Sequence, residues 1–171
     1  RKRVSSDLVC GEDGSYSIDF QDFEQKIVEN RVKLFILCNP HNPVGRVWTK
    51  EELLRIGTIC REHQVLVFSD EIHFDFIWSG GHYVFQEVDP AFREFTMTAT
   101  APSKTFNLAG LQASTAVFPN AHMKAMFDKF WTDMDIHRNN AFSVTAMEVA
   151  FNEGEEWLEQ LLPYISANFD F

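Results

Sequence analysis

The chain has 171 residues, with 15 Lys and Arg against 25 Asp and Glu, so its formal net charge is −10. Hydrophobic residues make up 45% and charged residues 23%, the balance of a folded globular domain rather than of a disordered or fibrous protein. The acidic charge argues against nucleic acid or an anionic membrane as a partner, and no apolar run of the sequence is long enough to cross a membrane.

The cysteines indicate the compartment. Cys10, Cys38 and Cys60 are 28 and 22 residues apart, and this odd number with wide spacing fits neither a disulfide framework nor a CxxC zinc site. We therefore expect free thiols and a cytoplasmic protein. Because the chain starts without Met and stops at Phe171, we also expect it to be a piece of a longer protein.

The first part of the chain alternates helix and strand patterns. Residues 19–30 carry apolar side chains at helical spacing, and Asp19 is a good N-cap for this helix. The apolar run 32–38 predicts a buried strand, which ends at the turn-rich sequence NPHNPVG of residues 39–45.

The alternation continues through the middle of the chain. Thr49 and Glu52 form a capping-box pattern at the start of a helix that is predicted to run to about His63. Further strands are predicted at residues 65–68, 95–98 and 113–118. Helical spacing then returns, in residues 123–134 and 157–165.

This order of elements predicts the fold class. Strands that alternate with helices are typical of an α/β protein with a parallel-dominated sheet and helices on both faces. We find no internal repeat, no low-complexity tract and no Gly/Ser linker, so the chain should form one domain or most of one.

Polar residues follow each predicted strand, where α/β sheets bind their ligands. Asn42, Asp70 and Lys104 are separated by 28 and 34 residues, each about the length of one βαβ unit. Taken singly, a turn asparagine, a capping aspartate and a surface lysine are ordinary. Together they predict an amide, a carboxylate and an amine at one edge of one sheet.

Pyridoxal phosphate needs such a set of groups. It requires a lysine amine for its Schiff base and an acidic partner that keeps the pyridine nitrogen protonated. It also requires a donor to the ring oxygen and hydroxyl or backbone N–H groups around the phosphate. Lys104, Asp70, Asn42 and Ser103 match these needs in turn.

Three sequence strings, NPHNPVG, SDEIHFDF and SKTFNLAGLQ, resemble the fold-type-I pyridoxal-phosphate enzymes of the aspartate-aminotransferase superfamily. Within that superfamily the chain looks most like the cystathionine β-lyase branch, the MalY/PatB-type C–S lyases. The resemblance implies that Lys104 is the Schiff-base lysine and catalytic base, Asp70 the partner of the pyridine nitrogen and Asn42 the donor to the ring oxygen. It also implies that Ser103 helps to hold the phosphate.

Two positions depart from the aminotransferase pattern. His73 stands where aminotransferases usually have a tyrosine that bonds the ring oxygen, and Gln112 stands where an arginine often pairs with the phosphate. Both residues are expected to face the cofactor, although Gln112 would offer only a neutral hydrogen bond to the phosphate. These departures favour a lyase over an aminotransferase, which stays the second hypothesis.

The resemblance further implies a reaction and an assembly. The reaction is the α,β-elimination of a small amino acid such as cystathionine or cysteine to pyruvate, ammonia and a thiol. Residues 1–171 would be part of a larger cofactor domain, with 143–171 leading towards a missing small domain, and the whole enzyme would be a homodimer. The chain alone is then expected to be inactive, and a binding-only relative or fragment is a third hypothesis.

A metal site is a rival interpretation of part of this set. Asp70, His73, Asp75 and His82 are potential ligands close together in the sequence, although their spacing matches no common metal motif. The sequence also lacks the GxSxG motif of many serine hydrolases. We therefore expect no metal and no nucleophilic triad.

Overall fold

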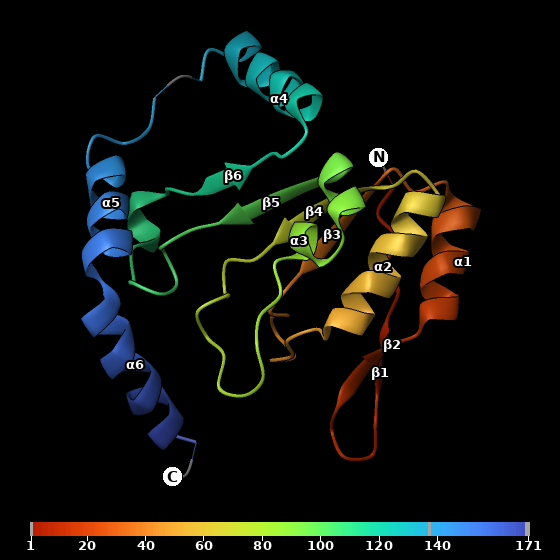
Figure 1. The fold of residues 1–171 in the computed structure, drawn as a ribbon, viewed down its shortest axis with the longest axis horizontal. Helices are drawn as coiled ribbons and strands as arrows, with labels where there is room; N and C mark the ends of the chain where they lie inside the picture. Colours follow the sequence, from red (N-terminus) through yellow and green to blue (C-terminus); the bar gives the residue numbers. More distant parts are fainter. Residues whose placement is uncertain (1, 137, 170–171) are drawn as a thin grey trace.

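The computed structural model describes residues 2–136 and 138–169 and has an α/β fold (Figure 1). A hairpin contains β1 (Leu8–Cys10) and β2 (Tyr16–Ile18), and a four-stranded sheet contains β3 (Leu34–Cys38), β4 (Leu66–Asp70), β5 (Thr96–Thr100) and β6 (Thr115–Val117). The α-helices are α1 (Phe20–Asn30), α2 (Lys50–Glu62), α3 (Phe85–Val88), α4 (Ala121–Asp133), α5 (Ser143–Glu153) and α6 (Glu155–Ala167). Two 3-10 helices, η1 (Pro90–Glu94) and η2 (Ala109–Leu111), precede and follow β5.

The larger sheet has the strand order β3-β4-β5-β6. The first three strands are parallel, as predicted, whereas β6 runs antiparallel to β5. The connection from β5 to β6 contains turns and η2 but no α-helix. Two neighbouring parallel strands are usually joined by a helical crossover. Because β5 and β6 are joined without one, β6 pairs with β5 in the antiparallel direction.

Both predicted helix starts are confirmed. The Asp19 side chain accepts hydrogen bonds from the backbone N–H groups of Gln21 and Asp22, which have no partner within the helix. At α2, Thr49 and Glu52 form the complete capping box. Because these caps are local, they begin each helix at the residue that the sequence predicts.

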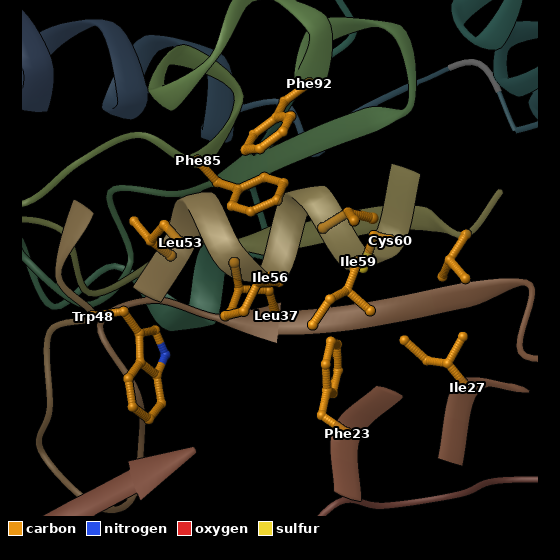
Figure 2. Close-up of a cluster of buried hydrophobic side chains, with 12 residues drawn as sticks. Phe23, Ile27, Leu37, Trp48, Leu53, Ile56, Ile59, Cys60, Phe85 and Phe92 are labelled. Carbon is orange, nitrogen blue, oxygen red and sulfur yellow. The ribbon is translucent and has the colours of Figure 1, made fainter. Parts of the chain in front are cut away.

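One face of the sheet is covered by helices. In Figure 2, α2 lies in the middle of a buried apolar cluster, between Phe23 and Ile27 of α1 on one side and Phe85 and Phe92 on the other. The rings of Phe85 and Phe92 are stacked, with 5.2 Å between their centroids. The odd-numbered strand residues Leu37 and Val67 point into this cluster, so the covered face follows the two-residue period of the strands.

The alternate strand residues form the opposite face. Leu34, Ile36 and Leu66 are 52%, 65% and 43% exposed. In the part of the chain that the structure describes, the covering helices of the apolar cluster therefore lie on one side of the sheet. The α/β class and the mostly parallel sheet are confirmed.

Some features differ from the sequence prediction in length or position. Asp70 is the last residue of β4 rather than a residue beyond the predicted strand 65–68, because β4 runs from Leu66 to Asp70. The hairpin of β1 and β2 was not predicted, since strands of three residues are too short to show a period. The predicted helical end of the chain is present as α4, α5 and α6, while residues 170–171 of the 143–171 stretch lie outside the described residues.

Two further predictions concern the whole chain. Cys10, Cys38 and Cys60 are free thiols; Cys60 is buried and Cys10 is exposed. Among the helices of residues 2–136 and 138–169, none is both long and apolar enough to span a membrane.

Gly57 should be required for the packing of α2. A Cβ atom at this buried position would lie 2.1 Å from the ring of Phe92. We expect Gly57→Ala to lower the free energy of unfolding by about 1–3 kcal/mol, the usual cost of an overpacked core. The midpoint of urea unfolding measures this change.

Gly81→Ala is the matched control, because a Cβ at Gly81 has no atom within 4 Å. Equal unfolding midpoints for the Gly57→Ala and Gly81→Ala proteins would contradict the expected clash.

Candidate functional site

The parallel strands bring their carboxyl ends to one edge of the sheet. Cys38 of β3 pairs in register with Asp70 of β4, and Asp70 pairs with Ala99 of β5. The backbone N–H of Asn39 donates to the carbonyl of Asp70 at 3.0 Å, and the N–H of Glu71 donates to the carbonyl of Ala99 at 2.9 Å. The segments that leave the three strands therefore start side by side, as the sequence predicts.

Asp70 lies at the centre of this edge. Its side-chain Oδ1 accepts a hydrogen bond from the backbone N–H of Ile72 at 3.3 Å, which orients the carboxylate. The thiol of Cys38 lies nearby. Burial raises the pKa of Cys38, and the negative charge of Asp70 raises it further. Asp70 is thus a half-buried carboxylate beside the end of β3.

His73 lies within the electrostatic influence of both this carboxylate and Lys104. Burial lowers the pKa of His73, the positive charge of Lys104 lowers it further, and the negative charge of Asp70 opposes both effects. Such opposed effects require the imidazole to lie near both charged groups. The structure therefore brings together three of the predicted site residues, from β4, the segment after it and the turn after β5.

A cavity of about 490 Å³ opens beside this group. Asn42 and His73, both predicted site residues, contribute to its lining. The rest of the wall includes the stacked rings of Phe76 and Trp78, whose centroids are 6.2 Å apart, and Arg46. An amide and an imidazole thus face a space with aromatic walls, which is typical of a small-molecule site.

The turn that carries Asn42 is fixed by buried polar contacts. Asn39 is fully buried; its Oδ1 accepts from the backbone N–H of Trp48, and its Nδ2 donates to the carbonyl of Tyr83. The indole N–H of Trp48 donates to the carbonyl of Cys38 at 3.0 Å. Asn42 itself is exposed. The contacts of Asn39 and Trp48 hold the turn on which the Asn42 amide lies.

The remaining predicted residues lie between β5 and β6. Ser103 and Lys104 are in the turn that follows β5, and Gln112 is the residue after η2. Gln112 has a left-handed backbone with φ 51°, and its N–H donates to the carbonyl of Ala109. Ser103, Lys104 and Gln112 lie outside the lining of the cavity at Asn42 and His73.

The potential ligands of the rival metal site point to other partners. Thr105 Oγ1 donates to Asp75 at 2.6 Å, and Nε2 of His82 lies 2.8 Å from Glu71. Within residues 2–136 and 138–169, no three His, Cys, Asp or Glu side chains form a group that could hold a metal ion.

The sequence and the fold have known counterparts. Residues 8–159 match the family described as aminotransferase class I and II. The chain is 46% identical over 159 residues to cystathionine β-lyase PatB of Bacillus subtilis, and the match covers 92% of the chain. The chain belongs to the class I and II aminotransferase family.

Solved structures show the same relation. Cystalysin from Treponema denticola, which contains pyridoxal 5′-phosphate, matches with a TM-score of 0.90 at 37% identity, over 95% of this chain and 41% of cystalysin. The pyridoxal-phosphate-bound C–S lyase from Staphylococcus hominis matches with a TM-score of 0.88 at 38% identity, over 98% and 42%. The chain also spans 41% of the Bacillus subtilis lyase, so it covers about two fifths of the length of these relatives. The resemblance stated from the three sequence strings is confirmed.

Phe76, Trp78 and Arg46 lie in the cavity wall but were not predicted as site residues. Phe76 and Trp78 follow His73 in the sequence, and Arg46 follows the turn that carries Asn42. Their closeness in the sequence to His73 and Asn42 could have indicated that they belong to the site. Arg46 also forms an ion pair with Glu52 at 2.8 Å, so its charge is balanced at the wall of the cavity.

The titration of His73 should report its two charged neighbours. We expect Lys104→Gln to raise the pKa of His73, because a nearby positive charge is removed, and Asp70→Asn to lower it, because a nearby negative charge is removed. The chemical shifts of the His73 ring protons, followed by NMR against pH, measure both changes.

The exposed ring of His122 on α4 is a control for changes elsewhere in the fold. Movement of the His73 pKa in the same direction in both variants would show that these charges do not act on the imidazole as the geometry indicates.

Proposed function

We propose that the protein is a pyridoxal-phosphate-dependent C–S β-lyase that acts on small amino acids of the cystathionine or cysteine type. The observation that carries the proposal is the place of His73 at the sheet edge, within the electrostatic influence of both Asp70 and Lys104 and in the wall of a cavity that Asn42 also lines. The names of the relatives, a cystathionine β-lyase and a C–S lyase with bound pyridoxal phosphate, support the same chemistry.

The residues present fit the cofactor. The Lys104 amine would hold its aldehyde carbon covalently, the Asp70 carboxylate would keep its ring nitrogen protonated, and the Asn42 amide would donate to its ring oxygen. Ser103 and Gln112 would serve the phosphate. When bound, the cofactor supplies an electron sink that stabilises negative charge on the α-carbon of the substrate.

The proton transfer would be carried out by Lys104. Its Nζ, once released from its covalent bond, would accept the proton from the α-carbon, as a positioned general base does. The electron pair of that C–H bond would form a double bond between the α- and β-carbons as the bond from the β-carbon to sulfur breaks, and the sulfur would leave as a thiolate. His73 would remain neutral, because burial and the charge of Lys104 lower its pKa, so it would offer a hydrogen bond without a second positive charge.

The proposal extends to the larger assembly. Residues 1–171 would be part of a cofactor domain, and residues 143–171 would lead to a smaller domain. The enzyme would be a cytoplasmic homodimer. Apolar side chains that are exposed on α4, with Met126 at 61% and Phe130 at 59%, support an interface with other protein.

An assay of the full-length protein tests the function. We expect release of pyruvate and ammonia from cystathionine without any 2-oxo acid, and we expect Lys104→Ala to lower the rate at least about 10²–10⁴-fold, the contribution of a positioned general base. Coupled measurement of pyruvate follows the reaction.

Lys124→Ala is the control, because Lys124 is an exposed lysine on α4 that pairs with Asp128. A strict requirement for a 2-oxo acid would show an aminotransferase instead. Full turnover by the Lys104→Ala protein would contradict the assignment of the lysine.

A further inference from the structure

The lysine and the carboxylate of the site lie on different elements. Asp70 ends β4, whereas Lys104 lies in the turn between β5 and η2. Lys104 is exposed, and within the described residues no hydrogen bond or ion pair fixes its side chain. Its position therefore depends on the residues that hold the backbone of the turn.

Thr105, the next residue along the chain, holds that backbone. It is only 1% exposed. Its Oγ1 donates a hydrogen bond to Oδ2 of Asp75 at 2.6 Å, and its carbonyl accepts one from the indole N–H of Trp157 at 3.0 Å. The residue next to Lys104 is thus held from two sides, by the segment after β4 and by α6.

The segment that carries Asp75 is itself anchored. It connects β4 to α3 as a long loop (Figure 1). At its start, the buried Glu71 accepts hydrogen bonds from Ser69 Oγ at 2.7 Å and from the backbone N–H of Phe85 at 3.0 Å. The second carboxylate oxygen of Glu71 lies 2.8 Å from Nε2 of His82. These contacts join both ends of the loop, so Asp75 presents its carboxylate from a fixed frame.

The same loop therefore directly follows Asp70, and its Asp75 side chain contacts Thr105, the neighbour of Lys104. Asp75 is only five positions after Asp70 in the sequence, whereas Thr105 is thirty positions after Asp75. The hydrogen bond between Asp75 and Thr105 is a short connection in space between the two charged groups of the site. A hydrogen bond to an ionised carboxylate is also among the stronger ones in proteins.

We propose that Asp75 is a positioning residue for Lys104 and that it acts through Thr105. The bond fixes the peptide on which Lys104 stands, so the amine stays near His73 and Asp70. This inference rests on the proposed function, in which Lys104 binds the cofactor covalently. Asp75 would touch neither the Lys104 amine nor the cofactor that this amine would bind. Its effect should therefore appear as a change in the reactivity of Lys104.

Chemical trapping measures that reactivity directly. The full-length protein is incubated with pyridoxal phosphate, reduced with borohydride and digested, and mass spectrometry quantifies the adduct on Lys104 relative to the exposed Lys50. We expect Asp75→Ala, which removes the acceptor, and Thr105→Val, which removes the donor, each to lower the relative amount on Lys104 by about ten- to one-hundredfold, the range of a hydrogen bond to a charged group. Thr105→Ser, which keeps the hydroxyl, should restore it.

Two further variants separate positioning from general loss of stability. Thr98→Val removes another buried hydrogen bond, from Thr98 Oγ1 of β5 to Gln86 of α3 at 2.9 Å, which involves neither Asp75 nor Thr105. This variant should leave the relative labelling of Lys104 unchanged. The double variant Asp75→Ala/Thr105→Val should label no less than either single variant, because both substitutions remove the same interaction.

The outcomes keep the two proposals apart. Absence of a Lys104 adduct in the unsubstituted protein would refute the proposed function and this inference with it. Normal labelling of Lys104 in that protein and equal labelling in Asp75→Ala and Thr105→Val would refute only the positioning role. A loss in Thr98→Val as large as in Thr105→Val would also refute it, because the effect would then follow stability alone.

Discussion

The parallel register of β3, β4 and β5 is the constraint on which the site depends. It sets Cys38, Asp70 and Ala99 side by side, so that the chain leaves all three strands at one edge of the sheet. A shift of one residue in β4 would turn Asp70 towards the opposite face. The register is fixed because Val67 and Ser69 are buried on the helix-covered face while Leu66 is exposed on the other. The packing of the core against α2 thus determines where the carboxylate of the site lies.

Buried polar contacts then fix the loops that leave the strands at this edge. Asn39 fixes the turn that presents Asn42, and Glu71 fixes the segment that carries His73. A buried polar group is costly unless its hydrogen bonds are satisfied, so these contacts leave few alternative arrangements for the loops. The loops at the site are therefore ordered by groups that take no part in the chemistry.

The local part of this design could be predicted from the sequence. Asp19 and Thr49 begin helices through contacts within three residues, and the apolar strands show their own period. The antiparallel direction of β6 could not be predicted, because it depends on how the chain returns after β5. The hydrogen bond of Asp75 to Thr105 spans thirty residues, so no periodicity or motif indicates it. The sequence placed Asp75 in a hypothetical metal site, whereas the fold turns it towards Thr105. The roles of all the predicted site residues stay predictions, since their chemistry appears only with a cofactor: Asn42, Asp70, His73, Ser103, Lys104 and Gln112.

The two faces of the sheet differ in what covers them. The face under α2 holds the buried core that sets the register, and the edge holds the polar groups of the site. The other face exposes Leu34, Ile36 and Leu66, and covering a leucine or isoleucine contributes about 1.5–3 kcal/mol. Such a surface can gain stability from further protein without any change at the edge, because strand residues alternate between the faces. The polar edge and the exposed apolar face are therefore separate surfaces of the same sheet, and a change in what covers the face leaves the register at the edge as it is.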